Sequence, residues 1–297
     1  MSEETGNRKT AQEVEEDLRR VGFSRVTGIT LEDADRSLTG NFSACADGRR
    51  VWIKYCQVTD RTKRALARLS GVTLLQDQGF IMPGYPGSAC DPQGDEKEKA
   101  SAIAECLLRF WGHRAGITTK QYLKELVSQY RMEQFILRAK GQESPALRKV
   151  EAFLEQSLND LVPGRLGLVH GDLKLTNLIL SGDGECLHAE LVDLENVHFG
   201  DPAEDLVNAA VFHQKGEERL WLEVLHALYP DGVPEEVFER IRIFSCLEAV
   251  DAMYFFLNFY GVVVHDRAQE VLDAYNDLKD RIPVWYQEAV TERAKTK

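Results

Sequence analysis

The chain has 297 residues and a formal net charge of −12, with 43% hydrophobic and 28% charged residues. This length is enough for a large core and two packed lobes, and the composition is that of an ordinary globular protein. The acidic excess argues against a general binder of nucleic acids or anionic membranes, because both carry negative charge. We therefore expect no nucleic-acid partner.

Neither a secretion signal nor a membrane span is predicted. The first 20 residues are charged and lack the apolar stretch of a signal peptide, and no run reaches 18 consecutive apolar residues. The six cysteines are scattered and form no CxxC pair, so neither a zinc site nor a disulfide framework is predicted. A reduced, cytoplasmic location is the expectation.

The first third of the chain is predicted to be a small, mostly antiparallel sheet that follows a lead-in over 1–19. Three runs are rich in β-forming residues, at 23–31, 41–56 and 72–87. The Asp47-Gly48 pair inside the second run is a hairpin signal. Between the second and third runs, residues 60–71 have helical spacing. This pattern predicts a β-rich N-lobe over 20–86 with one helix.

After a loop over 88–99 the pattern becomes helical. Amphipathic helices with 3.6-residue spacing are predicted at 100–116, 120–141, 145–161, 203–216, 217–230 and 234–261. Two strand-like stretches, 167–180 and 186–202, interrupt them. The predicted fold class is α+β, with the small N-lobe followed by a larger helical C-lobe over 87–297.

Polar side chains interrupt the apolar stretch GLVHGDLKLTNLIL, namely those of His170, Asp172, Lys174 and Asn177. Burying such a group without a partner costs about 1–3 kcal/mol. If 177–180 and 187–193 pair as a hairpin, alternation puts Asp193 at the end of an apolar face. The residues alone leave two interpretations: separate caps and turns, or one Mg²⁺ site built from oxygen ligands.

Three short motifs follow one another in this part of the chain. They are HGDxxxxN at 170–177, DxE at 193–195 and GDPxxDL at 200–206. In this order they resemble the aminoglycoside phosphotransferase and choline-kinase superfamily, which has a two-lobed, protein-kinase-like fold. The similarity is densest over 167–210 and looser from about 37 to 260. It implies an ATP- and Mg²⁺-dependent phosphotransferase that acts on a hydroxyl group of a small molecule.

The resemblance implies roles for the residues of the catalytic loop. Asp172 would accept a hydrogen bond from the attacking hydroxyl and act as the base. Lys174 would touch the transferred phosphoryl group, and the alternative for it is a solvated loop lysine. His170 would support the backbone of the loop, because the protein mostly positions groups and neutralises charge in phosphoryl transfer.

The resemblance also implies a metal site and its support. Asn177 and Asp193 would hold Mg²⁺ against the phosphates, with Glu195 close enough to help. Asp201 is typical of a helix N-cap, which accounts for it without catalysis. Asp205, just inside the same helix, would brace the catalytic loop.

For the nucleotide site the resemblance points to the N-lobe. A lone strand lysine is most often an edge residue, but the resemblance implies that Lys54 binds the α- and β-phosphates of ATP. The backbone from Met82 to Tyr85 would contact adenine. Ser37 and Thr39 would cradle the phosphates in a loop that has only one glycine.

The chain departs from the family at the partner of this lysine. Family members usually carry a glutamate in the N-lobe helix, but residues 33–95 contain no Glu. Asp60, Asp77 or a rearranged helix would have to pair with Lys54. A catalytically degenerate kinase fold, serving as a nucleotide-binding or scaffold protein, is therefore the alternative. The presence of the HGDxxxxN and DxE motifs favours an active enzyme over this alternative.

A small-molecule acceptor is favoured because the HRD, DFG and APE motifs of protein kinases are missing. Aminoglycosides and other antibiotics, amino alcohols and sugars are the implied classes, and antibiotic resistance is one implied role. Glu248, Asp251 and Tyr254 are the candidate substrate residues, at three-residue spacing on one helix, and the two acids would recognise a cationic substrate. The aromatic residues that follow, Phe255, Phe256 and Phe259, are expected in the core.

Overall fold

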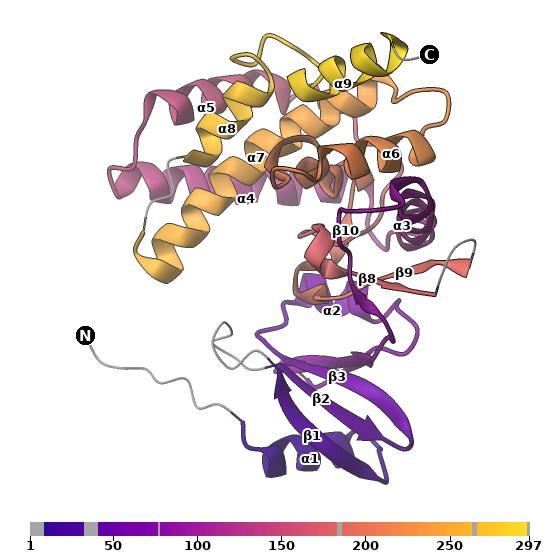
Figure 1. The fold of residues 1–297 in the computed structure, drawn as a ribbon. Coiled ribbons are helices and arrows are strands. Elements are labelled where there is room, and N and C mark those ends of the chain that lie inside the picture. The colour runs from indigo at the N-terminus through magenta and orange to yellow at the C-terminus, as the bar shows by residue number, and fades with distance from the viewer. Residues whose placement is uncertain (1–8, 33–40, 77, 183–185, 263–265, 296–297) are drawn as a thin grey trace.

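The computed structural model describes residues 9–32, 41–76, 78–182, 186–262 and 266–295. It has two lobes, with a small sheet and two helices at the N-terminal end and a group of helices at the other (Figure 1). The predicted α+β class, with a β-rich N-lobe and a helical C-lobe, is confirmed.

A five-stranded antiparallel sheet of order β1-β2-β3-β5-β4 forms the N-lobe. Its strands are β1 (Val26–Glu32), β2 (Asn41–Ala46), β3 (Arg49–Tyr55), β4 (Thr73–Leu74) and β5 (Gly79–Pro83). Asp47 and Gly48 join β2 to β3 with φ angles of 48° and 79°. Tight hairpins need positive φ at both turn positions, so the predicted hairpin is confirmed.

Helix α1 (Ala11–Arg20) packs against this sheet. Its Val14 and Leu18 are fully buried in the N-lobe core. The buried Asp17 accepts a hydrogen bond from the Tyr55 hydroxyl at 2.9 Å. The part of the lead-in from residue 11 onward is therefore an integral part of the N-lobe.

The long helix α7 (Glu235–Tyr260) forms the centre of the C-lobe. The other helices of this lobe are α3 (Glu96–Trp111), α4 (Thr119–Ala139), α5 (Pro145–Ser157), α6 (Glu218–Leu228), α8 (Asp266–Ala274) and α9 (Val284–Lys295). By length and composition alone α7 could cross a membrane. This is weak evidence, because core helices of globular proteins meet the same criteria and 44% of its most apolar segment is buried within the lobe.

Two small sheets lie between the lobes and carry the motifs. Strand β7 (Gly167–Val169) pairs with β10 (His198–Gly200), and β8 (Leu178–Ser181) pairs with β9 (His188–Leu191) and with β6 (Ser88–Ala89). The predicted β8–β9 hairpin is confirmed. Helix α2 (Asp60–Leu66) packs against β10, so an N-lobe element lies directly beside the motif segment.

The segment 203–216 was predicted as one helix, and this is wrong. It contains a 3₁₀ turn (Pro202–Glu204) and a short π-helical stretch (Asn208–Phe212). The Asp201 side chain accepts the Ala203 N–H and the Glu204 side chain accepts the Asp201 N–H, which closes a tight capped turn. Asp205 then directs its carboxylate inward, toward the catalytic loop.

Candidate active site

The catalytic loop is held by the buried carboxylate of Asp205. This carboxylate accepts hydrogen bonds from the backbone N–H groups of His170 and Gly171, both at 3.0 Å, and from the Trp111 indole at 2.8 Å. The His170 ring is fully buried, with Nε2 2.7 Å from the Val192 carbonyl. At Gly171, φ is 78° and an added Cβ would lie 2.6 Å from a backbone oxygen, so the turn requires glycine.

Asp172 is oriented by two neighbours in the same loop. The Lys174 ammonium lies 2.7 Å from Asp172 Oδ2. Asn177 Nδ2 donates to the Asp172 carbonyl at 2.9 Å and to Oδ2 at 3.2 Å. In the parts of the chain that the structure describes, Oδ1 has no hydrogen-bond donor. The carboxylate is therefore fixed with one oxygen left for a ligand, as a general base needs.

Lys54 pairs with the DxE motif itself. Its ammonium lies 2.5 Å from Asp193 Oδ1 and 3.0 Å from Glu195 Oε2. Burial opposes the charge on Lys54, but the two carboxylates outweigh it and raise the pKa of the lysine. Asp60, which was a candidate partner, points to solvent with its side chain 88% exposed. The other candidate, Asp77, lies outside the described residues.

The donor set around Asp193 fits Mg²⁺. Asn177 uses its amide nitrogen on Asp172, which leaves Oδ1 as an acceptor, and Asn177 lines the same cavity as Asp193. Glu195 shares the Lys54 ammonium with Asp193. Among the residues with described positions, no three His, Cys, Asp or Glu side chains form a closed metal cage. Mg²⁺ commonly uses one or two carboxylates together with phosphate oxygens and water, so these oxygens suit a metal that arrives with a nucleotide.

A cavity of about 170 Å³ lies under the N-lobe sheet. Its lining includes Lys54, Met82, Asn177 and Asp193, together with Asn41, Phe42, Trp52, Ile53, Phe80, Thr176 and Val192. Tyr85, another predicted adenine contact, is half-buried just beyond β5 but does not line this cavity. The predicted phosphate-loop residues Ser37 and Thr39 lie outside the described residues.

A larger pocket of about 520 Å³ adjoins Asp172 and is lined by the catalytic loop, α4 and α7. Glu248 and Asp251 line it, as predicted for substrate residues. Tyr254 does not, and packs against the C-lobe core instead. Three-residue spacing falls short of a helical turn by roughly 60° per step, so the third residue drifts off the shared face.

Sequence analysis missed Glu133, which comes from α4 and meets the acids of α7 in this pocket. Glu133 is 3% exposed and accepts a hydrogen bond from Gln129 at 2.9 Å. Burial, with the charge of Asp251 nearby, raises the pKa of Glu133 to about 9. The protein atoms around the Glu248 carboxyl keep water away from it, and together with the charge of Asp251 they raise its pKa, although part of the side chain stays exposed. A single glutamate in an amphipathic helix gives no sequence signal that it lies in a pocket with acids from another helix.

Arg61 of α2 was also missed. It lines the same pocket beside Glu195 and Glu204. Its buried Nε has no hydrogen-bond partner in the described chain. The helix in which the family resemblance predicts a glutamate therefore carries an arginine instead, and this arginine lines the larger pocket.

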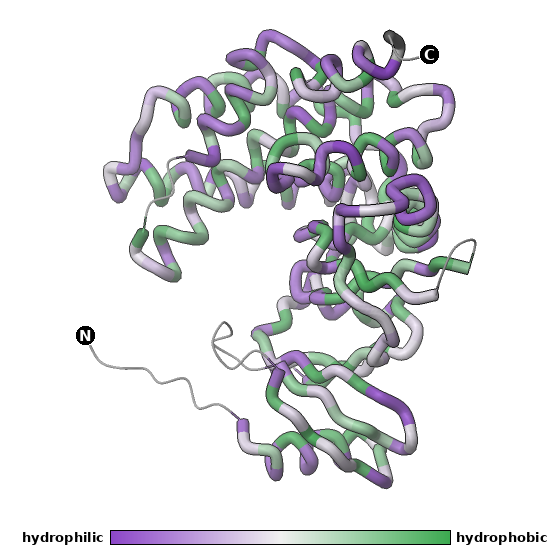
Figure 2. The backbone as a smooth tube through the Cα atoms, viewed as in Figure 1, coloured by the Kyte–Doolittle hydropathy of each residue, from purple (hydrophilic) through white to green (hydrophobic). Residues whose placement is uncertain are grey.

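The aromatic residues at the end of α7 are not in the core, which corrects the expectation from sequence. Phe255 is 42% and Phe259 is 67% exposed, and their rings stack on each other at 4.8 Å. Phe255 and Phe256 line the larger pocket that adjoins Asp172. The C-terminal turns of α7 extend past the neighbouring helices (Figure 2). The large hydrophobic side chains there are therefore exposed to solvent.

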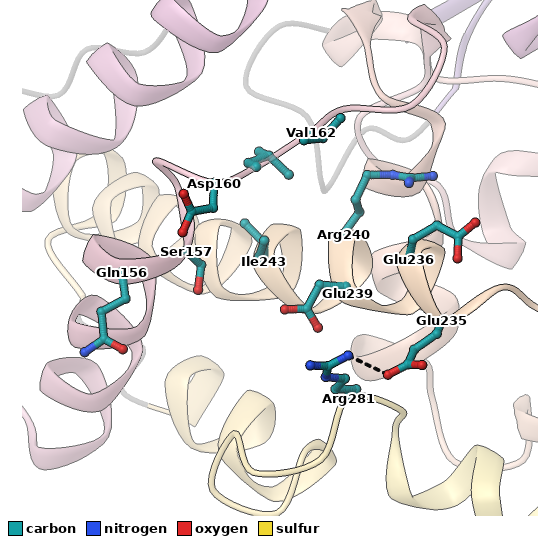
Figure 3. A pocket seen from close by; sticks show the side chains of 11 residues that line it. Gln156, Ser157, Asp160, Val162, Glu235, Glu236, Glu239, Arg240, Ile243 and Arg281 are labelled. Carbon is teal, nitrogen blue, oxygen red and sulfur yellow. Dashed lines mark hydrogen bonds and ion pairs between the residues drawn. The ribbon is translucent and has the colours of Figure 1, made fainter.

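A second hollow of about 520 Å³ lies where α5 and the start of α7 meet, and no motif residue lines it (Figure 3). Across its mouth Arg281 pairs with Glu235 at 2.6 Å. At its edge Arg240 reaches Asp201, with 3.0 Å between Nε and Oδ2. Asp201 also accepts the Gly164 N–H at 2.6 Å, so it is a structural brace.

Comparison with known proteins gave one family match. The model described as "Phosphotransferase enzyme family" matches residues 58–240, which is more than half of the chain. The match begins just before α2 and includes all three motifs. No curated protein matches the chain.

Several solved structures share the fold. The aminoglycoside phosphotransferase APH(2'')-IIa in complex with gentamicin is 14% identical, with a TM-score of 0.62 over 92% of this chain and 99% of that one. The ADP-bound aminoglycoside phosphotransferase APH(2'')-Ib is 13% identical, with a TM-score of 0.58 over 89% and 97%. A choline/ethanolamine kinase family protein from Mesorhizobium loti is 14% identical, with a TM-score of 0.55 over 94% and 99%. At these identities the likeness is one of fold.

Proposed function

The chain belongs to the phosphotransferase enzyme family, and we propose from this premise that it transfers the terminal phosphoryl group of ATP to a hydroxyl group of a small cationic molecule. One observation carries the proposal. Asp172, the candidate base, lies between a cleft that holds Lys54 and Asp193 and a pocket in which three acids, Glu133, Glu248 and Asp251, have no ion-pair partner within the described chain.

On the acceptor side, the free oxygen of Asp172 would accept a hydrogen bond from the substrate hydroxyl. It would take the proton as the new O–P bond forms and as ADP leaves. Lys174, 2.7 Å from the same carboxylate, would bring positive charge to the transferred group. Asn177 fixes the angle of the carboxylate.

On the nucleotide side, Lys54 would move from the two acids to the α- and β-phosphates. Asp193, Glu195 and Asn177 would then be free to hold Mg²⁺, which when bound neutralises charge on the phosphates. In this exchange every charged group keeps a partner of opposite charge, because the acids gain a metal ion when the lysine binds the phosphates. Lys54 is thus held near its proposed position before nucleotide arrives.

The cationic nature of the acceptor follows from the charge balance of the pocket. Glu195 shares Lys54 with Asp193, Asp172 pairs with Lys174, and Glu204 lies 3.0 Å from His198. The remaining three acids are Glu133, Glu248 and Asp251. Two arginines, Arg61 and Arg267, also line the pocket, but within the described chain neither forms an ion pair with any of these acids. Glu133 is buried and holds a proton near neutral pH, because burial and the charge of Asp251 raise its pKa to about 9. An ammonium group on the substrate would pair with these acids and favour their ionised form.

Matched pairs of acceptors test this proposal. Choline and its uncharged isostere 3,3-dimethylbutan-1-ol, and an amino sugar and its N-acetyl derivative, differ mainly in charge. We expect kcat/KM to be at least about tenfold higher for each charged member, since one such ionic contact contributes about 1.5–3 kcal/mol. Glu248→Gln should narrow the gap, whereas Asp231→Asn, an exposed control outside the site, should preserve it.

Two results would count against the proposal. Equal use of charged and neutral acceptors would show that the acids do not select charge. Binding of ADP with no transfer to any acceptor would instead fit a nucleotide-binding or scaffold protein on the same fold.

A further inference from the structure

Helix α2 brings a cation to the active site from the N-lobe. The helix lies between the N-lobe sheet and β10 (Figure 1), and it also packs against the 3₁₀ turn Leu194–Asn196, which contains Glu195 of the DxE motif. Arg61, the second residue of α2, lines the larger pocket together with Glu195 and Asp172. This arginine therefore faces the acceptor side of the site, beside both motifs.

Arg61 has no anionic partner in the part of the chain that the structure describes. Its buried Nε donates no hydrogen bond, and no described carboxylate forms an ion pair with its guanidinium group. Burial opposes the charge of Glu204, but His198, with a contribution from Arg61, outweighs it and lowers the pKa of this acid. The arginine thus lies near Glu204 without pairing with it. Because buried polar groups are nearly always paired, the free donor indicates that a ligand supplies the acceptor.

The transferred phosphoryl group is an anion that has to enter this space. In the proposed reaction it passes from the nucleotide cleft to a hydroxyl group beside Asp172, and cations stabilise the charge on its outer oxygens. Of the other cations that line the pocket, Lys174 pairs with Asp172 at 2.7 Å and Arg267 pairs with Glu270 at 3.1 Å. Among the described residues of the pocket wall, Arg61 is therefore the cation whose charge is left for a ligand.

We propose that Arg61 is a catalytic residue that binds the phosphoryl group while it passes from ATP to the acceptor. The inference rests on the proposed function, because it concerns the same reaction. A guanidinium group presents its N–H donors as a planar fork that matches two phosphate oxygens. The contact is made with the group in transit, so it supports kcat and leaves the binding of ADP unaffected.

Two other roles of Arg61 predict different results. An arginine that holds an anionic group of the acceptor would raise the KM for the acceptor when it is removed, and kcat would stay unchanged. An arginine that only balances the charge of Glu204 would contribute to stability and would not affect the binding of a phosphoryl mimic.

Steady-state kinetics with ATP and the best acceptor of the matched pairs above provide the first test. We expect Arg61→Gln to lower kcat about 10- to 150-fold, the range for one hydrogen bond to a charged group. Arg61→Lys keeps the charge but loses the fork, so its kcat should fall between those of the wild type and Arg61→Gln. The matched control is Arg64→Gln, which removes an exposed arginine from the same helix and should keep the wild-type kcat.

Calorimetry with ADP, Mg²⁺ and aluminium fluoride gives a readout that a structural role would not change. Aluminium fluoride is a planar anion that mimics the phosphoryl group in transit. It should tighten the binding of ADP to the wild type, and Arg61→Gln should reduce this gain by about 10- to 150-fold. The affinity for ADP alone should stay at the wild-type value.

A measurement on the wild type covers the case in which Arg61→Gln does not fold. Phenylglyoxal modifies arginine side chains, and mass spectrometry locates the modified residue. We expect ADP with Mg²⁺ and aluminium fluoride to slow the modification of Arg61, whereas ADP with Mg²⁺ alone should not. Equal rates under both conditions would overturn the role of Arg61.

The outcomes separate this inference from the proposed function. A wild type that transfers phosphate to no acceptor overturns the proposed function. A wild type that transfers phosphate, together with an Arg61→Gln variant of equal kcat, overturns the role of Arg61 alone. A change confined to the KM for the acceptor does the same, and so does an aluminium fluoride effect that is intact in Arg61→Gln.

Discussion

Asp172 shows how a single side chain is prepared for its role by its neighbours. Lys174 and Asn177 fix one oxygen and leave the other toward the pocket. We predict that Asp172→Ala lowers turnover about 10²- to 10⁴-fold, the contribution of a general base, while ADP affinity stays near the wild-type value. Turnover and ADP affinity measured on the same preparations would check this. A loss of turnover smaller than about tenfold would show that Asp172 is not the base.

Asp193 has an equally specific role at the metal end of the site. Its φ of 62° turns its carboxylate toward Lys54 and the cleft. Asp193→Asn keeps the size but removes one ligand charge. We predict that it raises the Mg²⁺ concentration for half-maximal turnover by at least about tenfold, the lower end of what residues that support metal sites contribute. The control Asp231→Asn should titrate like the wild type. An unchanged Mg²⁺ dependence would make Asp193 a strand-end cap.

At the scale of elements, the short turn at 201–205 supports the catalytic loop. Asp205 takes three N–H donors, two from the loop and one from Trp111. Asp205→Ala leaves these donors buried and unpaired, so we predict a loss of at least about 2 kcal/mol in the free energy of unfolding. Trp111→Phe removes only one of the donors together with its hydrogen bond and should cost less. Denaturant unfolding would rank the two, and the opposite order would contradict the bracing role.

Elements with local signals could be predicted from the sequence. The β2–β3 hairpin follows from Asp47-Gly48, and the β8–β9 hairpin follows from alternation. The stretch 203–216 looked helical because its apolar spacing is helical. Its backbone instead follows the buried carboxylates of Asp201 and Asp205, whose partners are far away in sequence.

The residues of the candidate site also differ in whether a local sequence signal identifies them. Residues within the contiguous motifs could be identified from sequence, because the spacing of the motifs is itself the signal. Glu133 and Arg61 could not, because each comes from a separate element and only the tertiary fold brings it to the cleft. The partner of Lys54 is a similar case, since it lies 139 residues away in Asp193.

At the scale of the whole molecule, Lys54 joins the two lobes. It extends from β3 of the N-lobe and pairs with two acids that follow β9. A hydrophobic cluster that includes Phe80 and Met82 of the N-lobe and Leu107 of the C-lobe supports the same junction. Nucleotide binding would exchange the ion pairs and leave the apolar contacts in place. The nucleotide would therefore replace the ion pairs between the lobes, whereas the hydrophobic contacts between the lobes would remain.

The pH dependence of global stability provides a test of the acceptor pocket. Glu133 has an ordinary pKa near 4.5, which is raised to about 9 in the folded chain by burial and by Asp251. Between these values the folded state holds a proton that the unfolded state has released. The free energy of unfolding therefore falls as pH rises through this window, and the effect of this group is absent below pH 4.5.

Glu133→Gln mimics the protonated acid at every pH, so it isolates this contribution. We predict that the variant matches the wild type in stability near pH 4.5 and becomes progressively more stable than the wild type toward pH 9. Thermal or urea unfolding of both proteins across this range measures the difference, which cancels the titration of groups that do not interact with Glu133. Glu155→Gln, on the exposed side of α5, serves as the control and should show no such trend. A difference between Glu133→Gln and wild type that is constant with pH would mean that Glu133 is ionised in the folded chain. In that case the pocket would present its full negative charge before any cation binds.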